Sequence, residues 1–78
     1  MPVRNTYEER AANLLKAELK RKGLTYAQLV DRLAENGIVE YERNLRNKLS
    51  RGKFTAAFML QCLEAAGVFT LRLEPQLD

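Results

Sequence analysis

Residues 43–68 read RNLRNKLSRGKFTAAFMLQCLEAAGV, and this stretch decides which fold we expect for the chain. In its first part, Leu45 and Leu49 stand one helical turn apart, and Tyr41 continues the apolar row toward the amino end. The spacing predicts a helix over Glu42–Arg51 that turns Tyr41, Leu45 and Leu49 toward a core.

The second part of the stretch predicts another helix, over Ala56–Ala66, because Thr55 stands where a helix-capping residue is expected. Within this segment only Gln61 and Glu64 are polar, so the helix is apolar nearly all round. Such a helix is expected to lie at the centre of the domain or to be half covered by another chain. Cys62, inside it, is expected to be a small buried residue.

Two further helices are predicted on the amino-terminal side of this stretch. The segments TYEE at 6–9 and TYAQ at 25–28 have the spacing of a capping box, which marks the start of a helix. These signals predict helices over Tyr7–Lys22 and Tyr26–Asn36, and so an all-α domain of four helices. Each helical pattern is followed by a glycine, the residue that most often ends a helix: Gly23, Gly37, Gly52 and Gly67.

The pattern changes at the carboxy-terminal end. From Phe69 to Glu74 apolar and polar residues alternate, which predicts a short β-strand with one buried face. Its partner is either the Val3–Arg4 segment or the same strand of a second copy, and an extended tail that packs onto the helices is the alternative. Because so small a domain gains from further burial, we expect a homodimer with Phe69, Leu71 and Leu73 in the interface.

Length and composition exclude several classes of protein. The chain has 78 residues, which suits a single domain over 1–78 with its helical core at 7–68. One cysteine and no histidine leave no intramolecular disulfide, no zinc site and no usual general base. We therefore expect neither an enzyme nor a bound metal or cofactor. No apolar run approaches the roughly 20 residues that span a membrane, and the chain begins without an apolar leader, so we expect a cytoplasmic protein.

The net charge of +3 is concentrated in one segment. Residues 43–53 hold five of the 13 basic residues and none of the ten acidic ones, so the rest of the chain is slightly acidic. Such complete segregation is typical of an element that binds a polyanion. A solvated helix face with incidental charge is the alternative.

The side of the helix at 42–51 that lies away from its leucines carries mainly amide and guanidinium groups. Arginine can pair with guanine and asparagine with adenine in the major groove. Asparagine is also a poor helix former, so two exposed asparagines inside a helix favour a role in base reading. An exposed polar face without function is the alternative. The residues on this side are Arg43, Asn44, Arg46, Asn47, Ser50 and Arg51.

The segments KGLTYAQLVDRL at 22–33 and NKLSRGKFTAAFMLQCLEAAGV at 47–68 resemble the Cro/repressor-type (XRE-like) helix-turn-helix superfamily of bacteria and phages. The matching parts include the Gly-Leu-Thr cap at 23–25 and Leu-Ser-Arg-Gly at 49–52. The second segment also looks like a small proteobacterial domain of unknown function related to that superfamily. The link at 34–42 is longer than the turn of about three or four residues that usually joins the two motif helices.

The resemblance implies a lambda-repressor-like fold in which the helix at 42–51 enters the major groove of double-stranded DNA. The protein is then a sequence-specific DNA-binding protein and a transcriptional regulator. An interaction module on the same scaffold that binds an acidic protein partner is the alternative, and Glu40 and Glu42 favour it because they would repel phosphates. The expected base-reading residues are Arg43, Asn44, Arg46, Asn47 and Ser50. The expected phosphate contacts are Thr25, Tyr26, Lys48, Arg51 and Lys53.

Overall fold

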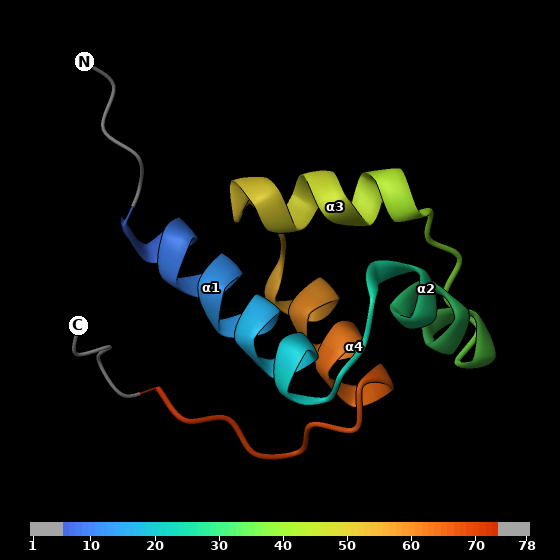
Figure 1. Ribbon diagram of the computed structural model, residues 1–78. Coiled ribbons are helices and arrows are strands. Elements are labelled where there is room, and N and C mark those ends of the chain that lie inside the picture. Colours follow the sequence, from blue (N-terminus) through green and yellow to red (C-terminus); the bar gives the residue numbers. More distant parts are fainter. Residues whose placement is uncertain (1–5, 74–78) are drawn as a thin grey trace.

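The computed structural model describes residues 6–73, and this part of the chain forms four α-helices and no β-strand. The all-α prediction is confirmed, and every helix end lies within one residue of its predicted place. None of the helices in the described part is both long and apolar enough to cross a membrane. The helices are α1 (Thr6–Arg21), α2 (Tyr26–Glu35), α3 (Glu42–Arg51) and α4 (Ala56–Ala65) (Figure 1).

Side-chain caps fix the starts of α2 and α4. The Thr25 hydroxyl accepts a hydrogen bond from the backbone N–H of Gln28 at 3.1 Å, and the Gln28 side-chain oxygen accepts one from the Thr25 N–H at 2.9 Å. This is the reciprocal capping box that the sequence predicts. The Thr55 hydroxyl likewise accepts a hydrogen bond from the Phe58 N–H at 3.0 Å. Each cap satisfies backbone donors that the first turn of a helix leaves unpaired, so local sequence is enough to start both helices.

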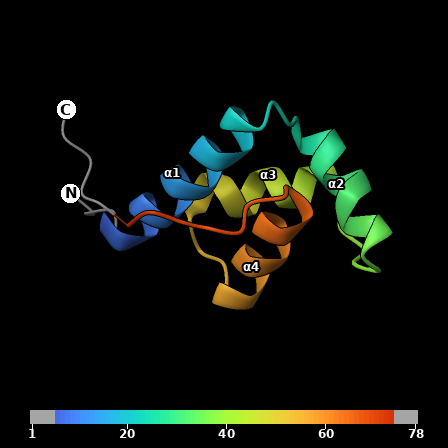
Figure 2. The same cartoon turned by 90° about the horizontal axis from the view of Figure 1, so that it is seen from below.

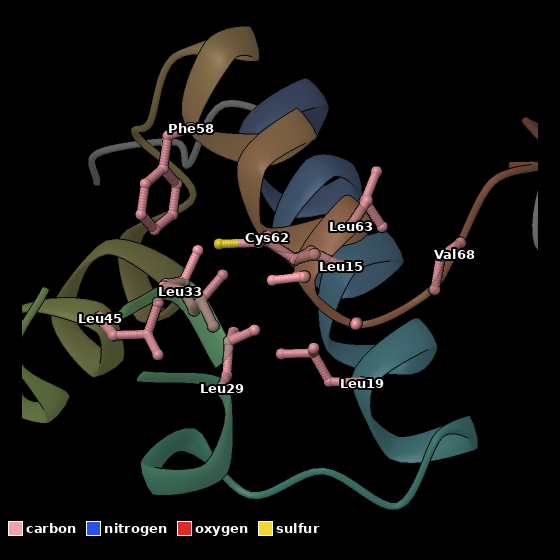
Figure 3. Close-up of a cluster of buried hydrophobic side chains, with 12 residues drawn as sticks. Leu15, Leu19, Leu29, Leu33, Leu45, Phe58, Cys62, Leu63 and Val68 are labelled. Atoms are coloured by element: carbon pink, nitrogen blue, oxygen red, sulfur yellow. The ribbon is translucent and has the colours of Figure 1, made fainter. Parts of the chain in front are cut away.

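The core receives side chains from all four helices. Both α3 and α4 pack against α1 and α2, and the leucines of the four helices meet between them. Cys62 lies in the middle of this cluster (Figure 3). Full burial of a leucine stabilises the fold by about 1.5–3 kcal/mol. The largest fully buried side chains are those of Leu15, Leu29, Leu33, Leu45, Leu49 and Cys62.

Helix α3 runs antiparallel along α1 (Figure 1). Gly52, just after the end of α3, lies against the backbone of Glu8 in the first turns of α1. At the other end, Glu42 and Arg46 border the same cavity as Lys20 from the last turn of α1. This arrangement leaves one long side of α3 on the outside of the molecule.

The predicted β-strand at Phe69–Glu74 is wrong for the residues that the structure describes, because residues 69–73 form no strand; Glu74 and the candidate partner Val3–Arg4 lie outside the described part. The alternation of apolar and polar residues has another cause. Leu71 packs half-buried against the helical core, whereas Phe69 and Leu73 are 81% and 69% exposed. An isolated extended segment satisfies the same pattern by packing one side chain onto the helices.

The prediction that Tyr41 belongs to the core is also wrong, since 66% of the residue is exposed. Tyr41 is the N-cap of α3, and its backbone is extended, with φ −115° and ψ 145°. A cap residue does not follow the helical rotation that relates Leu45 to Leu49. The buried row on α3 therefore begins at Leu45 and does not include Tyr41. Leu45 and Leu49 are fully buried, as predicted.

Candidate nucleic-acid interface

The outward side of α3 carries the set of residues that the sequence predicts for it. Leu45 and Leu49 anchor the helix in the core, and their complete burial fixes its rotation. Burial of these two leucines is therefore sufficient to expose the opposite side of α3 to solvent. The exposed residues of that side are Arg43, Asn44, Arg46, Asn47, Ser50 and Arg51.

Three of the exposed cations in and after α3 are not neutralised. Among residues 6–73, no ion pair joins Arg43, Arg51 or Lys53 to a carboxylate. All three side chains are exposed, and they extend from the first turn of α3 to just beyond its end. They place positive charge at both ends of the exposed side of α3.

Arg46 is held toward α2 in the structure. Its guanidinium lies 2.7 Å from the Glu42 carboxylate and 5.6 Å from the centre of the Tyr26 ring. Both partners of the ion pair are exposed, and an exposed ion pair contributes about 0–1 kcal/mol. The side chain can therefore be redirected to another anion at little cost. Its base-reading role stays a prediction.

Lys48 makes contacts that hold the fold together. Its ammonium lies 2.9 Å from the Glu40 carboxylate, whose side chain is only 10% exposed, and 4.5 Å from the centre of the Phe58 ring. These contacts join α3 to the link before it and to α4. The Glu40 carboxylate also accepts a hydrogen bond from the Tyr41 N–H at 3.3 Å. The phosphate contact expected of Lys48 stays a prediction, and it competes with these internal contacts.

The structure adds two lysines that the sequence reasoning did not include. Lys16 and Lys20 lie on α1 and border an open cavity of about 420 Å³ together with Thr25, Tyr26 and Arg46. The cavity also lies at the start of α2, where the helix dipole favours negative charge. Lys20 lies in the last turn of α1 beside Arg21, where cations also suit the helix dipole. The usable signal was the spacing of four residues, which places both lysines on one side of α1.

The cavity brings three of the predicted site residues together. Arg46 is distant in sequence from Thr25 and Tyr26, and the three residues meet at the junction of α1, α2 and α3. Lys53 and Arg51 lie at the far end of α3, near the start of α1, so the candidate interface extends along the whole of α3. Residues 69–73, which include the predicted dimer residues Phe69, Leu71 and Leu73, do not join it, because this segment lies on the opposite side of the molecule from α3 (Figure 2).

Cys62 behaves as a buried structural thiol. Burial raises its pKa from 9.0 to about 12, the Glu40 carboxylate adds to the rise, and Lys48 opposes it. The thiol is therefore protonated at neutral pH, and a protonated thiol is a poor nucleophile.

This pKa predicts a specific loss of stability in alkaline solution. The unfolded chain releases the thiol proton near pH 9, whereas the folded chain keeps it until about pH 12. The stabilisation is complete below pH 9 and is lost as the pH rises toward 12, by about 1.4 kcal/mol per pH unit. Urea unfolding at pH 8 and pH 10.5 measures it. The difference in unfolding free energy between the wild type and Cys62→Ala should shrink by about 2 kcal/mol. A difference that stays constant would contradict the buried, protonated thiol.

The comparisons with known proteins give a family without a function. Residues 7–71 match the model of the family described as "Domain of unknown function (DUF6471)". The expectation of a domain of unknown function is confirmed, and nothing in the match links this family to the Cro/repressor superfamily. No curated protein and no solved structure matches the chain significantly. Because the family model covers most of the sequence, the chain belongs to the DUF6471 family.

Proposed function

We propose that this protein binds double-stranded DNA in a sequence-specific manner, with α3 in the major groove, and that it acts as a transcriptional regulator rather than as an enzyme. The observation that carries the proposal is the outward side of α3. Two buried leucines fix the rotation of the helix, and the side that they expose combines exposed arginines with exposed asparagines. Arginine and asparagine are the residues that read guanine and adenine by paired hydrogen bonds. The resemblance to Cro/repressor-type helix-turn-helix domains supports the same use of this helix.

Base-reading contacts and phosphate contacts come from different parts of the interface. We assign base reading to Arg43, Asn44, Arg46, Asn47 and Ser50. Contacts to phosphates would come from both flanks of α3: Thr25, Tyr26 and the lysines at 16 and 20 at its start, and Arg51 and Lys53 at its end. Contacts on both flanks fix the register of a helix on the duplex, which is the role of phosphate contacts in DNA recognition.

The longer link between α2 and α3 is held in place, which favours a fixed orientation of α3. Ile38 packs half-buried against the core, and its N–H donates a hydrogen bond to the Leu33 carbonyl at 2.9 Å. The Glu40–Lys48 ion pair ties the second half of the link to α3. A recognition helix that is already oriented loses little entropy on binding.

A salt titration of binding to random-sequence duplex DNA tests the electrostatic part of this proposal. Four to six phosphate contacts should give a slope of about −4 to −5 for log K against log [salt], with little binding left at about 0.3 M salt. Fluorescence anisotropy measures the binding. Lys53→Ala should reduce the slope by about 1. Lys22→Ala is the matched control, because Lys22 lies beside the carboxy-terminal segment and away from α3, and it should leave the slope unchanged.

The rival function is binding to an acidic protein surface. The Glu42–Arg46 ion pair favours it, because a carboxylate in the first turn of α3 repels phosphates and a protein partner can avoid it. The same titration separates the two functions. If no binding to duplex DNA is detected at about 50 mM salt, where nonspecific binding should be strong, the DNA proposal is contradicted and the protein partner is favoured.

A further inference from the structure

An apolar hollow lies between α1, α4 and the carboxy-terminal segment. Its volume is about 430 Å³, and its walls come from both helices and from residues 71 and 73 of the extended segment. The apolar lining residues are Tyr7, Ala11, Leu14, Met59, Leu71 and Leu73. No part of the DNA interface proposed above borders this hollow.

Large apolar side chains protrude beside the hollow. Phe69 is 81% exposed and Leu60 is 58% exposed, and both border a smaller hollow of about 200 Å³ that shares Leu71 with the first one. Four of the six large exposed apolar residues in the described part belong to this surface: Tyr7, Leu60, Phe69 and Leu73. A concentration of this kind on a small domain marks a surface that another molecule covers.

The shape and the charges of this surface, which we call the apolar face, fit a second copy of the same chain. A twofold interface pairs one surface with itself, so the surface must carry both members of each complementary pair. The apolar face has a hollow and, next to it, the protruding Phe69 and Leu60 side chains. It also has Arg10 beside the larger hollow and Glu64 beside the smaller one. In a twofold pair of antiparallel faces, Arg10 of one protomer would lie opposite Glu64 of its partner and offer a complementary charge.

The apolar face lies on the side of the molecule opposite α3. Figure 1 shows α3 on one side of α1 and α4, and residues 66–73 on the other. The view in Figure 2 has this segment in front and α3 behind. A twofold axis that brings two apolar faces together reverses their outward directions. It therefore places the two α3 helices on opposite outer surfaces of the dimer.

We infer that the protein forms a homodimer through the apolar face and that this dimer bridges two separate DNA segments, one on each outer surface. The dimer interface does not depend on the proposed function, whereas the bridging rests on the proposed DNA binding by α3. This arrangement differs from a dimer that presents two helices to one palindromic site, which requires both helices on the same surface.

Sedimentation analysis of the full chain with surface variants tests the interface. The wild type should be dimeric at concentrations of a few hundred micromolar or below. Phe69→Glu and Leu60→Glu should each raise the dimer dissociation constant at least about tenfold, because each buries an unpaired carboxylate in the interface. Both residues are exposed in the monomer, so circular dichroism should show unchanged folding. Val39→Glu is the matched control, since Val39 is 79% exposed in the link before α3 and should leave the dimer unchanged.

A charge exchange tests the orientation of the two protomers. Arg10→Glu and Glu64→Arg should each weaken the dimer by placing like charges opposite each other. The double variant restores opposite charges and should recover dimer formation. A wild type that stays monomeric at hundreds of micromolar overturns the inference. A double variant weaker than both single variants overturns the antiparallel pairing.

A capture experiment tests the bridging. An immobilised duplex loaded with the wild type should retain a second, fluorescent duplex at about 50 mM salt. Phe69→Glu should bind the immobilised duplex and retain none of the second. A dimer that binds one duplex without capturing another contradicts the opposite placement of the α3 helices. A dimer that binds no DNA supports the interface and contradicts the proposed function, so the two failures are distinct.

Discussion

Replacing Gly52 with alanine is expected to destabilise the protein by about 2–5 kcal/mol. Gly52 has a φ of +69°, a left-handed conformation that costs an alanine about 1–2 kcal/mol. A Cβ at this position would also lie 2.1 Å from the carbonyl oxygen of Glu8 in α1. The clash is with backbone, so no side-chain rotation relieves it, and the end of α3 must move away from α1. Since a domain of this size is stabilised by about 4–12 kcal/mol, thermal or urea unfolding will reveal the loss easily.

Gly23→Ala is the matched control for this substitution. Gly23 has the same φ of +69°, and a Cβ there meets no atom within 4 Å. It should lose only the conformational cost of about 1–2 kcal/mol. The excess for Gly52→Ala then measures the close packing of α3 on α1. Equal losses for the two variants would contradict that contact.

Replacing Leu45 with alanine is expected to cost about 2–5 kcal/mol. Leu45 is fully buried in the cluster that joins α3 to α1 and α2, so the substitution leaves a cavity that its neighbours fill only in part. For a domain of this size each kcal/mol lowers the melting temperature by about 4–8 °C. Val39→Ala is the control, because Val39 is 79% exposed and lies outside the apolar face. A melting temperature unchanged by Leu45→Ala would show that α3 is rotated differently, and the proposed reading side would then be wrong.

The helices could be predicted because their start and stop signals are local. A capping threonine forms its hydrogen bonds within three residues, and Thr25 and Thr55 do so as expected. The left-handed backbone that ends a helix likewise favours glycine at that one position, as at Gly52. The burial of Leu45 and Leu49 follows from helical spacing alone, and with it the direction of the exposed side of α3.

The features that could not be predicted depend on contacts between distant residues. Alternation at 69–73 has the same appearance in a strand and in a tail that packs one leucine, and only the surrounding helices decide between them. The role of Lys48 depends on Glu40 and on the Phe58 ring of another helix. Lys16 belongs to the candidate interface because α2 and α3 approach that side of α1. The spacing of residues within one helix does not predict any of these contacts between elements.

Selection of preferred sequences from a random pool of DNA duplexes tests directly whether α3 reads bases. The wild type should enrich one short motif. On that motif Asn47→Ala should lose about 1–3 kcal/mol of binding free energy, with little change on random DNA, while Lys53→Ala should weaken binding to both by similar amounts. Base reading by α3 is contradicted if the wild type binds the pool and enriches no motif, or if Asn47→Ala enriches the wild-type motif with unchanged preference at every position.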